Sequence, residues 1–207
     1  MKLTWFGHSC FKLESADGVI VFDPSENGRV PGYDALPEVF EADAVLCSHG
    51  HGDHNAAELV QLSGKAFGGK ISFVDSWHDD AKGTKRGSNK IAVVETEGLK
   101  VVHMGDIGCE LNGEQSAALN APDLLMIPVG GFYTVDAKTA RAIADKLGAK
   151  IVVPMHYRSG ERGYDVIATV DEFLEMSDNV KKYADGCIEV TANTEAQTAH
   201  LGYKGSF

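Results

Sequence analysis

The sequence predicts a mixed α/β fold, α+β in some schemes, built on two sheets. Three observations carry this prediction. Short apolar or alternating runs typical of strands dominate the first half of the chain, helical spacing enters between the later strands, and no linker divides the chain. There is also no repeat and no low-complexity stretch. We therefore predict one domain over residues 1–207.

Strand patterns open the chain and are separated by turn residues. Strands are predicted at residues 3–6, 10–14, 19–22 and 42–47. Asp17-Gly18 has the composition of a hairpin turn, and the Gly- and Pro-bearing segment 25–40 predicts a loop. Segment 55–62 has helical character, so the stretch before it is predicted to be a strand-to-helix loop.

The second half alternates strands and helices. Strands are predicted at residues 71–74, 90–95, 99–103, 123–129, 151–154 and 186–191, and helices at 136–147 and 166–176. A charged, glycine-bearing loop is expected at 78–89. Gly148 follows the first of these helices directly and is a suitable C-cap. We expect the apolar strands to form the core and the polar functional groups to lie in the loops between them.

The composition is globular and acidic. Of the 207 residues, 43% are hydrophobic and 24% charged, and the formal net charge is −11. Such a chain repels phosphate backbones and anionic lipid, so we expect neither nucleic acid nor a membrane as partner. A bound metal would still give a local positive site for an anionic substrate. We expect a small-molecule substrate, and the sequence leaves the oligomeric state open.

Cysteine usage and the N-terminus predict a cytoplasmic protein. The chain has four cysteines and no C-x-x-C pair; they are Cys10, Cys47, Cys109 and Cys187. Scattered cysteines favour reduced thiols over a disulfide framework. The first residues show no apolar run followed by a small-residue cleavage site, and no window approaches the length of a transmembrane helix.

One short stretch, "CSHGHGDHN" (47–55), concentrates metal-binding side chains. His49, His51, Asp53 and His54 fall within six positions and are spaced by glycines. Imidazole and carboxylate are common ligands of divalent metals, and glycines let a loop turn these side chains together. His49 and His51 can share one direction while Asp53 and His54 point to a second position. The spacing therefore predicts two metals, with more ligands supplied from elsewhere.

The pattern H-x-H-x-D-H resembles the signature of the metallo-β-lactamase superfamily. The stretches "WFGHSCFKLE", "VIVFDP", "WHDDAKGTKRGSN", "LKVVHMGDIG", "LLMIPVGGFYTVDA" and "IVVPMHY" are similar to further landmarks of its small Zn-dependent hydrolase branch, in the same order. This resemblance spans nearly the whole chain. It implies a four-layer αββα sandwich with a metal site at one edge, between the two sheets.

The resemblance also implies a complete ligand set. The first metal would be held by His49, His51 and His78, the second by Asp53, His54 and His156, with the carboxylate of Asp106 shared by both. All seven residues offer nitrogen or oxygen donors, so Zn²⁺, Mn²⁺ and iron are compatible. Family usage favours zinc, and we expect two divalent ions.

Four further residues are candidates with open alternatives. His8 follows a strand and either supports a ligand, faces the substrate or packs. His103 has the same three readings and also that of a direct ligand. Asp23 closes a strand and either orients a ligand histidine or only forms a turn before proline. Tyr157 either places its hydroxyl in the cleft or is structural.

These residues predict a metal-dependent hydrolase. Two divalent cations about 3.5–4 Å apart can bridge a hydroxide at neutral pH, and Asp53 could hold this nucleophile and accept its proton as the catalytic residue. The bond cleaved would be an ester, lactone, amide or phosphodiester. Lys85 and Arg86, in the loop after His78, either meet an anionic substrate or are solvated.

Two other functions stay open. The same ligands could support an iron-dependent oxidation, which iron content would reveal. A non-catalytic metal- or ligand-binding protein would need a closed coordination shell, and the sequence shows no additional Cys or His to close it. A nuclease is disfavoured because the acidic chain has no spare length for a domain that grips nucleic acid.

Overall fold

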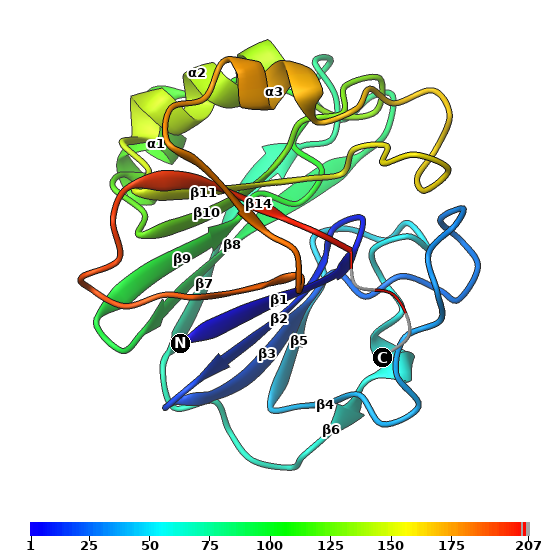
Figure 1. The fold of residues 1–207 in the computed structure, drawn as a ribbon, viewed down its shortest axis with the longest axis vertical. Coiled ribbons are helices and arrows are strands. Elements are labelled where there is room, and N and C mark those ends of the chain that lie inside the picture. The colour runs from blue at the N-terminus through cyan, green and yellow to red at the C-terminus, as the bar shows by residue number, and fades with distance from the viewer. Residues whose placement is uncertain (204, 206–207) are drawn as a thin grey trace.

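The computed structural model describes residues 1–203 and 205, and it shows two sheets packed face to face (Figure 1). The smaller sheet has the order β13-β1-β2-β3-β5, with β1 (Lys2–Gly7), β2 (Cys10–Ser15), β3 (Gly18–Phe22), β5 (Ala44–Leu46) and β13 (Cys187–Glu189). The larger has the order β12-β14-β11-β10-β9-β8-β7, with β7 (Lys70–Trp77), β8 (Ser88–Thr96), β9 (Leu99–His103), β10 (Leu124–Pro128), β11 (Ile151–Met155), β12 (Val180–Tyr183) and β14 (Gln197–Leu201). The mixed α/β class with two sheets is confirmed.

Strand direction decides where the polar loops meet. In the smaller sheet β1, β2 and β3 alternate in direction and β3 runs parallel to β5. In the larger sheet β7, β8 and β9 alternate, and β9, β10 and β11 are parallel. The carboxyl ends of β1, β3 and β5 therefore point in the same direction in the smaller sheet. Those of β7, β9 and β11 likewise share one direction in the larger sheet. Figure 1 shows these loops facing each other at the right of the molecule.

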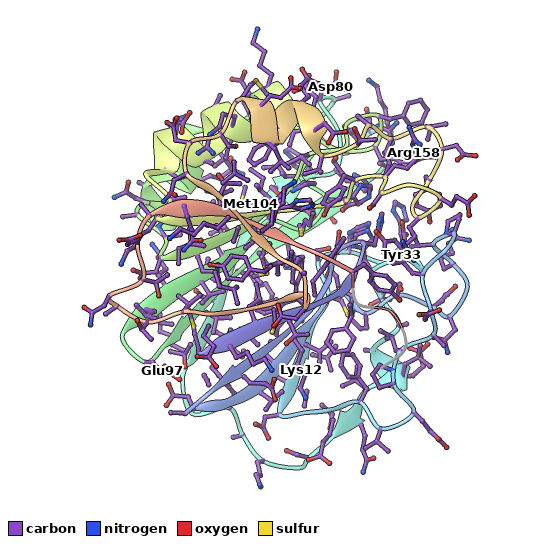
Figure 2. All side chains as sticks on the ribbon, viewed as in Figure 1. Lys12, Tyr33, Asp80, Glu97, Met104 and Arg158 are labelled. Carbon is purple, nitrogen blue, oxygen red and sulfur yellow. The ribbon has the colours of Figure 1, made fainter. Side chains whose placement is uncertain are left out.

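The space between the sheets is filled by apolar side chains (Figure 2). Phe11, Leu13, Ile20 and Phe22 are fully buried from the smaller sheet. Three helices lie outside the larger sheet: α1 (Gly113–Leu119), α2 (Ala137–Leu147) and α3 (Asp171–Glu175). Helix α2 begins at Asp136, whose carboxylate accepts a hydrogen bond from Thr139 N at 2.8 Å, and ends at Gly148 in the left-handed conformation. The predicted helix 136–147 and its C-cap are confirmed.

The predicted helix at 55–62 is wrong. The chain forms only the 3₁₀ turn η1 (Ala57–Leu59) and then the short strand β6 (Gln61–Leu62), which pairs with β4 (Glu41–Ala42). Val60 has the extended conformation and is buried with Phe40 and Ala42 against the outer side of the smaller sheet. Tertiary burial therefore outweighs helical spacing here. In the described residues the outer layer on this side consists of η1, this two-stranded sheet and loops.

The predicted helix at 166–176 is shorter than expected. Only Asp171–Glu175 is helical, because Ala168 forms backbone hydrogen bonds with Gly130 and Arg158 that a helix would break. Helix α1 and strands β12 and β14 were not predicted from the sequence. His200 lies in β14 and is only partly exposed. In the described residues no helix is long and apolar enough to cross a membrane.

Candidate metal centre

Every metal-ligand candidate lies just beyond the carboxyl end of a strand. The loop with His49, His51, Asp53 and His54 follows β5. His78 follows β7, Asp106 follows β9 and His156 follows β11; in the smaller sheet His8 follows β1 and Asp23 follows β3. Because the carboxyl ends of these strands lie on the same side of the molecule, residues that are far apart in the sequence converge there. A backbone hydrogen bond from His156 N to His8 O joins the two sheets at this point.

Three of the candidate histidines surround the carboxylate of Asp106. Its Oδ2 lies 3.1 Å from Nε2 of His54, 3.1 Å from Nε2 of His156 and 3.4 Å from Nε2 of His78. Nε2 of His49 and Nδ1 of His51 are 3.0 Å apart at the more exposed side. Asp106 thus occupies the position between histidines from three different loops.

The ligand atoms fall into two neighbouring groups. His49, His51 and His78, the first triad, have donor atoms within 4.8 Å of one another. Asp53, His54 and His156, the second triad, lie within the same distance of one another and of His8. Among the described residues, Nε2 of His54 and Oδ1 of Asp106 are buried without a hydrogen-bond partner. Convergent nitrogen and oxygen donors with such unsatisfied atoms fit divalent cations.

Hydrogen bonds of the Asp23 carboxylate position a histidine in each triad. This carboxylate is fully buried and accepts a hydrogen bond from Nδ1 of His54 at 2.8 Å. It also accepts hydrogen bonds from Ser48 N at 2.7 Å and Ser48 Oγ at 2.6 Å. Ser48 Oγ in turn lies 2.9 Å from Nδ1 of His49. Asp23 therefore orients His54 directly and His49 through Ser48, and in both rings Nε2 is the nitrogen turned toward the other candidate ligands.

Asn89 positions Asp106. The Asn89 side chain accepts a hydrogen bond from Asp106 N at 2.9 Å and donates one to Met104 O at 2.9 Å, and it is fully buried. Gly105, between Met104 and Asp106 in the chain, has φ +56°. A Cβ at this position would collide with the side chains of Asn89 and Ser48. Glycine is thus required for the turn that brings Asp106 into the centre.

Charge coupling within the site is strong. Burial opposes ionisation of Asp106, but the imidazoles of His156 and His54 hold its pKa well below the usual range. Burial also disfavours the charged form of His54, yet the carboxylates of Asp106 and Asp23 raise the pKa of His54 well above its usual value. Asp106 is therefore an ionised, acceptor-only group, as a metal ligand must be.

His8 lies behind the second triad. It is buried, its Nε2 is 3.5 Å from Oδ2 of Asp53, and its ring centroid is 4.0 Å from that of His156. Burial and the neighbouring His156 lower the pKa of His8 to about 3, so the imidazole is neutral at pH 7. Neither ring nitrogen has a hydrogen-bond partner among the described residues. The structure places His8 beside the donors rather than on the cleft wall.

Three site residues adopt unusual backbone conformations. His8, Asp23 and His156 have φ values of +50°, +41° and +52°, in the left-handed region that non-glycine residues rarely occupy. Each is the first residue after a strand. The sharp bend turns these side chains from the sheet direction into the site, and such strain concentrates at functional positions.

The structure separates two of the weaker candidates from the cleft. Nε2 of His103 donates to Ser9 O at 3.0 Å, Nδ1 accepts from Gly105 N at 3.2 Å, and the ring stacks on Phe22. Both nitrogens are thus engaged, and the packed alternative describes His103. Tyr157 is buried and stacks on Trp5 with centroids 5.5 Å apart, so its hydroxyl does not reach the cleft.

Tyr164 takes the position expected for Tyr157. Its hydroxyl lies 3.2 Å from Oδ2 of Asp53, and its ring packs edge-on to His8. Burial and the negative charge of Asp53 raise the pKa of Tyr164, so the hydroxyl remains a donor at neutral pH. No motif marks Tyr164, because its connection to Asp53 spans 111 residues.

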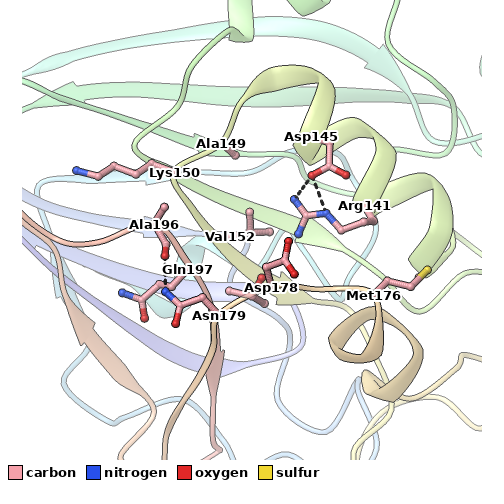
Figure 3. Close-up of a pocket in the computed structure, with 11 residues that line it drawn as sticks. Arg141, Asp145, Ala149, Lys150, Val152, Met176, Asp178, Asn179, Ala196 and Gln197 are labelled. Carbon is pink, nitrogen blue, oxygen red and sulfur yellow. Dashed lines mark hydrogen bonds and ion pairs between the residues drawn. The ribbon is translucent and has the colours of Figure 1, made fainter.

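A cleft opens onto the metal-ligand candidates. Its volume is about 440 Å³, within the range of small-molecule sites. Its walls combine the candidate ligands with basic and aromatic side chains: Arg29, His51, Asp53, His78, Arg86, Asp106, Tyr133, His156 and Tyr164. A second hollow lies between α2 and the start of β14 (Figure 3), where Arg141 is paired with Asp145. That hollow contains no candidate metal group among the described residues.

Sequence comparisons identify similar proteins over most of the chain. The β-lactamase superfamily domain matches residues 2–156. A metal-dependent hydrolase from Archaeoglobus fulgidus is 29% identical over 196 residues, which cover 77% of this chain and 84% of the relative. A metal-dependent hydrolase from Thermococcus onnurineus is 29% identical over 210 residues, covering 85% and 92%.

A solved structure extends the likeness to three dimensions. It is a candidate Zn-dependent hydrolase of the metallo-β-lactamase superfamily from Thermotoga maritima. It shares 34% sequence identity with this chain and superposes with a TM-score of 0.79, covering 97% of this chain and 98% of the other. The similarity therefore includes both sheets and all the loops that carry the candidate ligands.

Proposed function

Because this chain belongs to the metallo-β-lactamase superfamily, whose similar members are metal-dependent hydrolases, we propose that it is a hydrolase with two divalent cations, zinc by family usage, acting on a small soluble substrate. His49, His51 and His78 would hold one ion, Asp53, His54 and His156 the other, and Asp106 both. The bond cleaved is an ester, lactone, amide or phosphodiester.

The chain's own residues supply orientation and proton transfer. When bound, two divalent cations supply a hydroxide nucleophile at neutral pH and polarise the attacked oxygen. Asp53 lines the cleft, and in this proposal its carboxylate would accept the proton of the nucleophile. Tyr164 donates to Asp53 Oδ2 at 3.2 Å and keeps that carboxylate in one orientation. Asp23 holds the tautomer of His54 by accepting from its Nδ1.

The convergence of two donor triads on one carboxylate carries this proposal. Three imidazole nitrogens lie within 3.4 Å of Asp106 Oδ2, and they come from three different loops. A polar network that served only stability would satisfy its buried atoms, whereas among the described residues Nε2 of His54 and Oδ1 of Asp106 are buried without a hydrogen-bond partner. Metal ions explain both the convergence and the unsatisfied atoms.

Metal stoichiometry of matched variants tests the proposal. We expect mass spectrometry to find two ions per chain, one in His51→Ala and one in His156→Ala, and metal-dependent cleavage of an ester, lactone or phosphodiester that chelation abolishes. Glu110→Gln, at an exposed acid outside the cleft, serves as control and should keep both ions. One ion per chain in the unaltered protein, or none after titration, would overturn the dinuclear site.

A further inference from the structure

We propose that the substrate carries an anionic group, a carboxylate or a phosphoryl group, and that Arg29 and Arg86 bind this group in the cleft beside the metal centre. This inference rests on the proposed function and names its substrate class. Both arginines line the cleft whose wall also contains Asp53, Asp106 and His156. They reach it from two loops that are far apart in sequence, one after β3 and one after β7.

Hydrogen bonds to one carboxylate hold the loop that carries Arg86. The buried carboxylate of Asp79, next to His78, accepts four backbone hydrogen bonds, from the N–H groups of Ala81, Gly83, Lys85 and Arg86. The loop therefore keeps one shape, and Arg86 extends from a backbone that is anchored beside a metal-ligand candidate.

The guanidinium of Arg86 lies on an aromatic wall. Its Cζ is 5.5 Å from the ring centroid of Tyr133, and Tyr133 packs edge-on to Tyr164 at 5.8 Å. Tyr164 in turn donates to Asp53. A continuous row of side chains thus runs from Arg86 to the metal-ligand candidates. Stacking on a ring fixes the plane of a guanidinium and leaves its N–H edge open for a planar or tetrahedral oxyanion.

Neither cleft arginine is neutralised by an acidic side chain in the described part of the chain. Some other basic residues of the molecule do form ion pairs with acidic side chains. Nζ of Lys85, on the same loop, lies 2.7 Å from Asp80, and Arg141 forms two contacts with Asp145 across one turn of α2 (Figure 3). Arg29 and Arg86 are therefore free to pair with a ligand, and oxyanions are the groups that arginine binds most strongly.

An anionic substrate would need local cationic groups at the cleft, because the overall charge of the chain opposes its approach. With a net charge of −11 the chain repels anions at long range. A neutral substrate would need no arginine at the cleft, since the cations and the tyrosine wall would be enough to hold it. Two unpaired guanidinium groups in an acidic protein are explained by a substrate whose own negative charge must be overcome.

Matched esters test the proposal. The probes are the 4-nitrophenyl monoester of succinate, its methyl ester as the uncharged partner, and 4-nitrophenyl 3-phosphonopropanoate as the phosphoryl partner, each with the zinc-loaded protein. We expect kcat/KM to favour a charged ester, and this preference to fall about tenfold or more in Arg29→Gln and in Arg86→Gln, as the loss of a charge-assisted hydrogen bond gives. The ester preferred by the unaltered protein, carboxylate or phosphonate, identifies the anion.

Lys85→Gln is the matched control, because it removes the same charge from the same loop at a side chain outside the cleft. Its preference should stay unchanged. Equal losses in Lys85→Gln and Arg86→Gln, or no loss in either arginine variant, would overturn the proposal.

A binding measurement separates this inference from the proposed function. Titration calorimetry with butanoate and propylphosphonate should show weaker binding to Arg29→Gln/Arg86→Gln than to Lys85→Gln at equal zinc content. If no ester is hydrolysed but this difference is found, the hydrolase proposal fails and the anion site stands. If binding is the same in all variants, the anion site is wrong whatever the enzyme hydrolyses.

Discussion

At the scale of single residues, the centre depends on buried groups that hold the candidate ligands. Asp23, Ser48 and Asn89 do not line the cleft, yet their hydrogen bonds set the orientation of His54, His49 and the Asp106 loop. Such support is expected wherever histidines bind metal, because the second ring nitrogen must donate to a partner. The sequence pointed to Asp23 through its place at a strand end, whereas Ser48 and Asn89 carried no signal of their own.

Asp23→Asn should weaken metal binding and leave the fold intact. The amide would place an NH₂ opposite Nδ1 of His54 and move the imidazole proton to Nε2, the atom that faces Asp106. We expect zinc affinity to fall about 10- to 100-fold, measured by competition with a fluorescent chelator. Asp43→Asn, at a carboxylate that caps Val19 and Ser63, is the control and should bind zinc normally.

Tyr164→Phe should lower catalysis without removing metal. Loss of the donor to Asp53 is expected to reduce kcat/KM about tenfold or more, the value of one hydrogen bond to a charged group, at unchanged metal content. Tyr133→Phe removes a hydroxyl from the same cleft without touching Asp53, and we expect a smaller effect. Loss of zinc from Tyr164→Phe would show instead that the tyrosine is needed for metal binding.

At the scale of elements, the ends of the strands account for the position of the site. Tertiary burial accounts for the helices that the sequence predicted wrongly. Long, periodic segments such as α2 and β8 lie where the sequence predicts them. The segments that differ, 55–62 and 166–170, are short and are pulled into other conformations by tertiary contacts: Val60 is buried against the smaller sheet, and Ala168 bonds to Gly130. Helical spacing over two turns is too weak to resist such contacts.

The end of α2 offers a stability test. Gly148 has φ +65° and ψ +38°, and its N–H bonds to Asp145 O. Gly148→Ala should destabilise the protein by about 1 kcal/mol or more and lower Tm by about 2–4 °C, because a side chain strains this left-handed cap. Gly113→Ala, in α1 with ordinary φ and open space, should leave Tm unchanged or raise it slightly. Equal effects at both positions would contradict this account.

At the scale of the whole molecule, metal and fold should be coupled. The candidate ligands join loops from both sheets, so ions bound there link the two halves of the core. Chelation is expected to lower Tm by about 5–10 °C, from the roughly 2.7 kcal/mol that a ligand at 100 times its Kd contributes. Differential scanning calorimetry with and without EDTA measures this shift. His51→Ala/His156→Ala should show no dependence of Tm on zinc.

The sequence alone pointed to a metal site and located most of the strands along the chain. Four donors within six residues on a glycine-rich loop must lie close in any fold, and apolar runs must be buried. Its likeness to a known family implied His78, Asp106 and His156. The tertiary structure alone decided that Tyr164, Arg29 and Arg86 face the same cleft, that Tyr157 does not, and that His103 packs on Phe22. These residues meet only when the two sheets close, and no local spacing records a contact that spans a hundred residues.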